Sequence, residues 1–152
     1  MRLTIAAVGR LKAGPEKALY DLYAKRITWP LVLREVEERR KLTAAERMQR
    51  ESALLLGACP AGAMLVALDR RGKALDSPGL ARWVGTRIDS GTADLAFLVG
   101  GADGHTEDLL KRCTLVLSFG PMTFPHLLAR VLLVEQLYRA QQILAGHPYH
   151  RT

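Results

Sequence analysis

Short apolar runs alternate with stretches of helical periodicity along most of the chain. The runs are rich in Val, Leu, Ile and Ala, which suits buried strands, and they cover residues 3–8, 31–36, 63–68, 95–100 and 114–119. Strands separated by helices are typical of a parallel sheet, because a parallel connection needs a crossover. We therefore predict an α/β fold with a largely parallel sheet flanked by helices, formed by a single domain over residues 1–152.

The helical stretches carry recognisable start signals. A capping residue accepts a hydrogen bond from a free N–H group of the first turn, and proline is tolerated there because its missing donor is not needed. In chain order the signals are Pro15, the capping box of Thr43 and Glu46, the cap Ser77 followed by Pro78, and the cap Thr106. The predicted loops between these elements are short, and many carry glycine at the end of a strand.

The last helix is predicted from about Pro125 to Ala145, with Gly146 as its stop. Arg130 projects from the middle of its apolar face. An arginine in that place needs a partner, because burying a lone charge costs several kcal/mol. A carboxylate inside the fold, a second subunit and a bound ligand are all open as partners for Arg130.

Charge favours an anionic partner, but its distribution leaves two interpretations. The net charge is +7, and residues 1–60 hold 12 Lys and Arg against 7 Asp and Glu, whereas residues 61–120 hold 7 of each. A basic surface of this kind attracts nucleic acid. The alternative is that the basic residues merely solvate a loop and a helix face; they are Arg39, Arg40, Lys41, Arg47 and Arg50.

Several classes of protein lack support in the sequence. The apolar N-terminus is interrupted at Gly9 and Arg10, and no uninterrupted run of eighteen apolar residues exists, so we expect a cytoplasmic protein that is not membrane-bound. Cys59 and Cys113 are too few for a disulfide framework, and we expect two buried, reduced thiols. We also expect no metal site, because His147 and His150 lack a third ligand.

Three unusual segments follow the last three predicted strands. They are LDRRGK at residues 68–73, GGADG at 100–104 and FGPMTFPH at 119–126. Ligands of parallel sheets collect at the carboxyl ends of strands, so these segments are candidate binding loops. An ordinary tight turn is the alternative for GGADG, since no dinucleotide fingerprint, P-loop, HExxH motif or Ser-His-Asp arrangement accompanies it.

These segments also carry a resemblance. LDRRGK, LVGGADG (98–104), LSFGPMTFPHLLARVLLVEQLYRA (117–140) and the terminal HPYHR (147–151) are together similar to the RlmH-type SPOUT methyltransferases of bacterial ribosomal RNA. The similarity begins at the N-terminal RLTIAAVGRLK, so it covers nearly the whole chain.

The resemblance implies a fold, an activity and partners. It implies a SPOUT-type open sheet with a deep trefoil knot in roughly residues 65–152, and a homodimer. It implies S-adenosylmethionine as the cofactor and N3 of a pseudouridine in large-subunit ribosomal RNA, free or within the ribosome, as the methyl acceptor. Another SPOUT reaction, such as ribose 2′-O methylation, is an alternative. A non-catalytic factor that binds RNA or the ribosome is a second one.

The resemblance also implies the residues that contact the cofactor. They carry over by position to Leu68, Gly100, Phe119, Gly120, Pro121, Met122, Thr123 and Phe124. Relatives often carry a serine and a polar or basic residue where Gly120 and Pro121 stand, so we expect only backbone contacts from this pair.

Methylation at N3 needs a base, because an imide proton has to leave, and histidine is the side chain that titrates near neutral pH. We expect His150 to be that base, with His126 as the second candidate, and Arg151 or Arg130 to hold a phosphate or the developing negative charge. We further expect RNA to be held by the basic N-terminal surface of a partner subunit, formed by Arg10, Lys12, Lys25 and Arg26.

Overall fold

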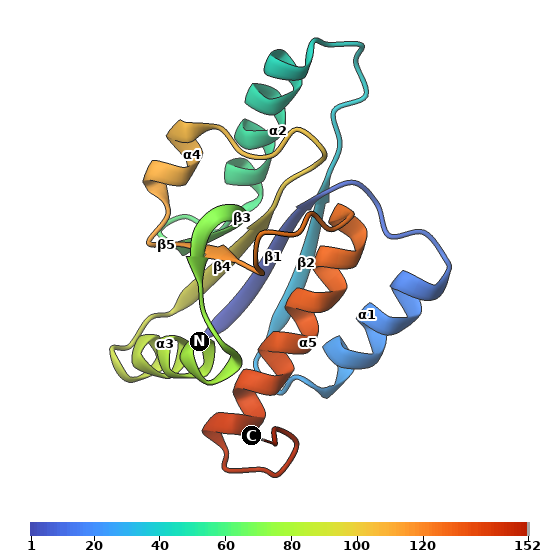
Figure 1. The fold of residues 1–152 in the computed structure, drawn as a ribbon. Coiled ribbons are helices and arrows are strands. Elements are labelled where there is room, and N and C mark those ends of the chain that lie inside the picture. The colour runs from blue at the N-terminus through green and yellow to red at the C-terminus, as the bar shows by residue number, and fades with distance from the viewer. Residues whose placement is uncertain (152) are drawn as a thin grey trace.

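The computed structural model describes residues 1–151, and Thr152, the last residue of the predicted domain, lies outside them. Strands and helices alternate, as the apolar runs predict (Figure 1). The elements are β1 (Arg2–Val8), α1 (Pro15–Arg26), β2 (Leu31–Val36), α2 (Ala44–Ala58), β3 (Met64–Ala74), α3 (Ser77–Asp89), β4 (Asp94–Val99), α4 (Glu107–Arg112), β5 (Leu115–Ser118) and α5 (His126–Leu144).

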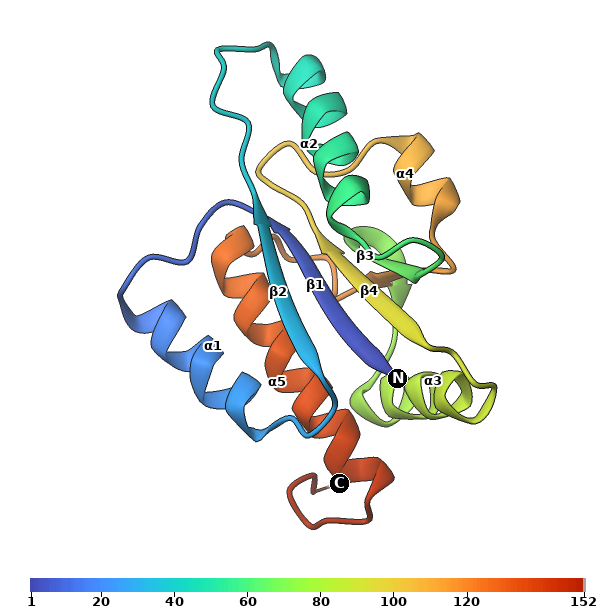
Figure 2. The ribbon, with the colours of Figure 1, turned by 180° about the vertical axis from the view of Figure 1, so that it is seen from behind.

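The five strands form one sheet in the order β2-β1-β4-β3-β5, and every neighbouring pair is parallel. This confirms the predicted sheet flanked by helices. The apolar side chains of α1, α3 and α5 pack with one face of the sheet in one core cluster, and those of α2 and α4 pack with the other face in a second cluster. Figure 2 shows α2 and α4 on the side that faces away in Figure 1. The knot implied for residues 65–152 stays a prediction.

The segment LDRRGK is extended chain rather than the predicted loop. β3 continues to Ala74, and its register shifts so that Leu68 and Lys73 both lie opposite Leu117 of β5. A Cβ atom on Gly72 would lie 2.4 Å from the carbonyl oxygen of Val116, a distance that no side chain tolerates. Glycine therefore lets the bulged end of β3 lie directly against β5.

Two of the predicted helix caps are confirmed and one is displaced. Thr43 forms both bonds of its capping box, and Thr106 accepts from the backbone N–H of Leu109. Ser77 is the first helical residue rather than the cap; the carboxylate of Asp76 accepts from the backbone N–H of Gly79 over 2.6 Å. The hydroxyl of Ser77 is thereby free to bond elsewhere, and it donates to Gln136 of α5 over 2.6 Å.

The two thiols are free and half-buried rather than fully buried. Each lies at the C-terminal cap of a helix and donates to the carbonyl four residues before it, that of Leu55 for Cys59 and that of Leu109 for Cys113, both over 3.3 Å. Burial raises the pKa of both thiols to about 11, which disfavours the reactive thiolate.

Candidate active site

A cavity of about 920 Å³ opens at the carboxyl ends of β3, β4 and β5. These strands are neighbours in the sheet, so the three unusual segments that follow or extend them converge there. The cavity lies within the size range of small-molecule sites. Its lining comes from residues 68–71, 99–105, 107, 119, 120 and 122–126, with Met48 and Ala129.

Most residues of the predicted cofactor set line this cavity, and one does not. Pro121 is absent from the lining, while Met122 beside it is 74% exposed. The residues that do line it are Leu68, Gly100, Phe119, Gly120, Met122, Thr123 and Phe124. The resemblance thus selected residues that the fold brings together from three separate strand ends.

Gly120, the second residue of the 119–125 loop, has a backbone conformation that favours glycine. Its φ is +107°, and its backbone N–H donates to Ser118 Oγ over 3.0 Å while its carbonyl accepts from the same hydroxyl over 3.1 Å. No atom lies within 4 Å of the place where a Cβ would stand. The backbone conformation, rather than crowding, therefore favours glycine here.

Arg71 ties two walls of the cavity together. Its guanidinium meets both carboxylate oxygens of Asp69 over 2.9 Å, donates to Glu107 over 2.6 Å and donates to the carbonyl of His105 over 3.2 Å. The hydrogen bond from Arg71 holds the pKa of Asp69 below its usual range. These bonds therefore hold the bulged end of β3 at a fixed distance from the start of α4.

Two buried polar side chains flank the glycine pair of the second segment. The ring of His105, which is 2% exposed, lies 3.1 Å from the place where a Cβ on Gly100 would stand. Glu51 of α2 approaches Gly101 in the same way, at 3.0 Å. Burial lowers the pKa of His105 and raises that of Glu51, so both neutral forms are favoured. Any residue other than glycine at position 100 would crowd the ring of His105, and at position 101 it would crowd the carboxylate of Glu51.

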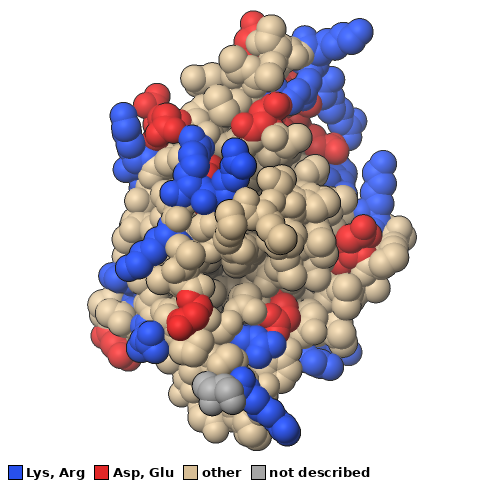
Figure 3. Space-filling model, in the orientation of Figure 1, with Lys and Arg blue, Asp and Glu red and all other residues tan. Residues whose placement is uncertain are grey.

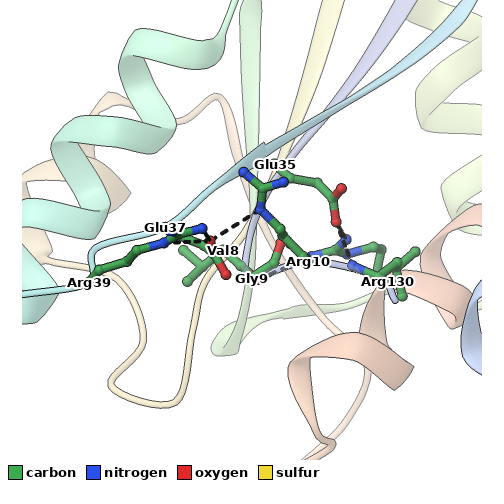
Figure 4. A network of polar contacts seen from close by, with 8 residues as sticks. Val8, Gly9, Arg10, Glu35, Glu37, Arg39 and Arg130 are labelled. Carbon is green, nitrogen blue, oxygen red and sulfur yellow. Dashed lines mark hydrogen bonds and ion pairs between the residues drawn. The ribbon is translucent and has the colours of Figure 1, made fainter. Parts of the chain in front are cut away.

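The partner of Arg130 is a carboxylate inside the fold, rather than a second subunit or a ligand (Figure 4). Its fully buried guanidinium donates to Glu35 Oε2 of β2 over 2.6 Å and to the carbonyls of Val8 and Gly9 over 3.1 Å each. Glu35 also accepts from the backbone N–H of Leu11 over 2.7 Å. The network joins the ends of β1 and β2 to α5 next to His126, which lines the cavity.

The structure places the two candidate bases at opposite ends of α5. His126 is its first residue and lines the cavity, where burial, and secondly the charge of Arg130, lower its pKa. His150 follows the far end in the sequence and docks back on the helix, where its Nδ1 lies 3.2 Å from Arg139 Nη1. Arg139 is thirteen residues along α5 from His126, a rise of about 20 Å. The structure therefore brings His126 into the cavity of its own subunit and leaves His150 and Arg151 outside it.

The terminal segment is docked rather than loose. The hydroxyl of Tyr149 donates to Glu135 over 3.0 Å, and its ring packs edge-on against Tyr138 with 4.8 Å between centroids. The guanidinium of Arg139 lies 4.8 Å from the centre of the Tyr149 ring and pairs with Glu135 over 2.6 Å. Arg139 donates to His150 Nδ1, so the neutral ring carries its proton on Nε2.

Comparison with known proteins identifies the family of this chain. The family model described as "Predicted SPOUT methyltransferase" matches residues 1–150. The chain belongs to the SPOUT methyltransferase family.

Curated SPOUT relatives match over the full length. The chain is 55% identical over 152 residues, all of both chains, to "Ribosomal RNA large subunit methyltransferase H" of Rhodospirillum centenum. It is 53% identical over 151 residues, 99% of each chain, to the protein of the same name from Paramagnetospirillum magneticum. A solved structure, a probable methylase family protein from Haemophilus influenzae, has a TM-score of 0.56 at 12% identity over 99% of this chain and 70% of that one, which supports the fold.

The basic stretch of this SPOUT chain is largely engaged with its own acids. Glu37 accepts from Arg10 and Arg39, and Glu38 accepts from Arg40 and Arg50. The hydrogen bond from Arg40 is the main cause that lowers the pKa of Glu38 to about 2. Basic and acidic side chains therefore alternate at this end of the molecule, as the upper part of Figure 3 shows. This pairing supports the solvated-loop interpretation for most of the stretch.

Within residues 1–151, no group of three or more His, Cys, Asp or Glu side chains is placed to hold a metal ion. None of the helices described for this SPOUT chain is long and apolar enough to cross a membrane.

Sequence reasoning missed Arg70, Arg71 and His105 as residues of this SPOUT site. The sequence predicts LDRRGK as a binding segment and assigns a cofactor contact to Leu68 alone within it. Two adjacent arginines at the end of a strand were the available signal. Nothing local marked His105, because its burial depends on its packing against Gly100 in the folded chain.

Proposed function

We propose that the chain is an S-adenosylmethionine-dependent methyltransferase of large-subunit ribosomal RNA. The observation that carries the proposal is the cavity built from three strand-end segments, in a chain whose curated relatives bear the name "Ribosomal RNA large subunit methyltransferase H". The acceptor that the resemblance implies is N3 of a pseudouridine, and we adopt it as the finer proposal.

The residues of the cavity suit the cofactor. Apolar side chains, among them Leu68, Phe119 and Phe124, would exclude water from an adenine ring, and Gly100 and Gly120 leave backbone groups open to close approach. When bound, the cofactor supplies a methyl group already activated on a sulfonium. The chain's own residues would hold and orient it, and the remaining task is to position the acceptor and remove its proton.

His126 is the base candidate that one subunit can supply alone. It lines the cavity, and the lowered pKa keeps its ring neutral near pH 7, so a ring nitrogen is free to take the N3 proton of the acceptor. In the docked position, Arg139 occupies Nδ1 of His150, so the neutral ring has its N–H donor at Nε2. We therefore propose His126 as the base and His150 as a donor that binds a carbonyl or phosphate oxygen of the RNA.

A homodimer would let His150 act on the cavity of the other subunit. Because the terminal segment docks on Glu135 and Arg139, nine and thirteen residues along α5 from His126, it does not reach its own cavity, and a partner with α5 in the opposite direction would bring the two together. Exposed apolar side chains on α1 and α5 supply surface for such a contact; they are Leu19, Leu22 and Leu128.

Mixing two inactive variants tests this arrangement. We expect His126→Asn and His150→Ala to be inactive separately. If His150 serves the partner's cavity, each mixed dimer contains one intact site, and mixing followed by subunit exchange restores activity. If both residues serve one subunit, no mixed dimer has an intact site and activity stays absent, which would overturn the shared site.

The reaction itself is tested by locating the methyl group. Ribosomes from cells that lack the protein are incubated with it and with isotopically labelled cofactor, and the RNA is digested to nucleosides for mass spectrometry. Label on the base of pseudouridine supports the proposal. Label on a ribose would establish 2′-O methylation, and calorimetry that detects no cofactor binding would favour a non-catalytic factor.

A further inference from the structure

Arg70 differs from the other cations around the cavity. Arg70 and Arg71 are the lysine or arginine residues that line it within the described part of the chain. The guanidinium of Arg71 is committed to Asp69, Glu107 and a backbone carbonyl. Arg70 is exposed, and its side chain has no hydrogen-bond or ion-pair partner among residues 1–151. It is thus a cation at the edge of the cavity whose charge no carboxylate neutralises.

Arg10 and the arginines of the basic stretch differ from Arg70, because their charges are already paired with carboxylates. Arg10 and Arg39 share Glu37, and Arg40 and Arg50 share Glu38, at distances of 3.0 to 3.1 Å. An anion that bound these side chains would compete with carboxylates already in place. Arg70 has no such competitor.

The backbone that carries Arg70 is held on both sides. Asp69 Oδ1 accepts from the backbone N–H of Arg71 over 2.9 Å, so the side chain before Arg70 holds the backbone after it. Gly72 follows and lies against the backbone of Val116. The backbone of Arg70 is therefore held against the sheet, and only its side chain is free to reach a ligand.

We propose that Arg70 binds a backbone phosphate of the RNA substrate next to the nucleotide that enters the cavity. A guanidinium offers paired N–H donors that match two phosphate oxygens. Figure 3 shows Lys and Arg side chains gathered over the region that β3 and α4 occupy in Figure 1, beside an uncharged surface. The inference rests on the proposed function, because it concerns the RNA that this reaction would use.

The test compares Arg70→Gln with Arg82→Gln. Arg82 is an exposed arginine on α3, at the opposite end of the sheet in Figure 1, so its loss changes the net charge equally without touching the cavity. Large ribosomal subunits that lack the modification are the probe, and their Kd is measured over a series of salt concentrations. Calorimetry measures the Kd of S-adenosylmethionine for each variant.

We expect Arg70→Gln to raise the Kd for subunits about fivefold to tenfold and to reduce the slope of log K against log salt by about 0.7 to 0.9. Arg70→Lys, which keeps the charge, should recover most of the affinity, and Arg82→Gln should match the wild type. The Kd for the cofactor should stay within about twofold in all variants.

Each other outcome has a distinct meaning. Unchanged affinity and salt slope in Arg70→Gln would overturn the inference, as would an equal loss in Arg82→Gln. Weakened cofactor binding in Arg70→Gln would overturn it too, because the residue would then act on the cofactor. A wild type that binds subunits but not S-adenosylmethionine would contradict the proposed function and leave the phosphate contact standing.

Discussion

The guanidinium of Arg130 donates to the carboxylate of Glu35 over 2.6 Å, although the two residues are 95 positions apart. The Arg130 side chain is 0% exposed and that of Glu35 is 29% exposed. The pair joins α5 to β2 one helical turn after His126, the first residue of the helix. It therefore fixes the helix end that forms one wall of the cavity.

Arg130→Met should lower the free energy of unfolding by about 3 kcal/mol, because it leaves the carboxylate and the carbonyls of Val8 and Gly9 without their donor. Urea unfolding followed by circular dichroism measures this. Glu35→Gln should cost less, because the amide oxygen still accepts. A loss below about 1 kcal/mol for Arg130→Met would show that the network contributes little to stability.

Much of the fold was predictable because the information is local. Each of the five strands begins within one residue of a predicted apolar run, and the capping box at Thr43 marks the start of α2. The convergence of three segments was also predictable, since parallel strands present their carboxyl ends on one edge of the sheet.

The remainder depended on contacts between distant parts of the chain. Asp76 rather than Ser77 caps α3, because two adjacent side chains could each accept the bond and tertiary contact with α5 engages Ser77. The internal partner of Arg130 lies on another strand, and the sequence alone left it open. The extension of β3 needs β5 beside it.

Gly72→Ala should disrupt the cavity through the backbone. The added Cβ would stand 2.4 Å from the carbonyl oxygen of Val116, so β3 and β5 have to separate. We expect a loss of at least about 2 kcal/mol in unfolding free energy and weaker cofactor binding. Gly57→Ala is the matched control: no atom lies within 4 Å of its Cβ position in α2, and alanine there should stabilise by about 0.5 to 1 kcal/mol. Equal behaviour of the two variants would contradict the crowding argument.

His105 should make stability depend on pH in mildly acidic solution. Burial lowers its pKa in the folded state, so the unfolded chain takes up a proton at a higher pH than the folded chain does. The stabilising contribution is complete above the unfolded pKa of about 6.5 and declines as the pH falls towards the folded value. His105→Leu should therefore lose less stability than the wild type between about pH 7 and pH 5. Urea midpoints measured across this window decide it, and parallel curves for the two proteins would refute the prediction.

The docked terminal segment should be released by Tyr149→Ala and much less by Tyr149→Phe. Phenylalanine keeps the edge-on contact with Tyr138 and loses only the bond from the hydroxyl to Glu135, which contributes about 1 kcal/mol. Alanine also removes the ring that packs against the guanidinium of Arg139, the group that bonds to His150. Because Tyr149 and His150 belong to the segment that follows α5, global unfolding should change little while amide exchange in residues 145–151 accelerates in Tyr149→Ala. Exchange rates equal to those of the wild type would show that the segment is held by contacts other than Tyr149.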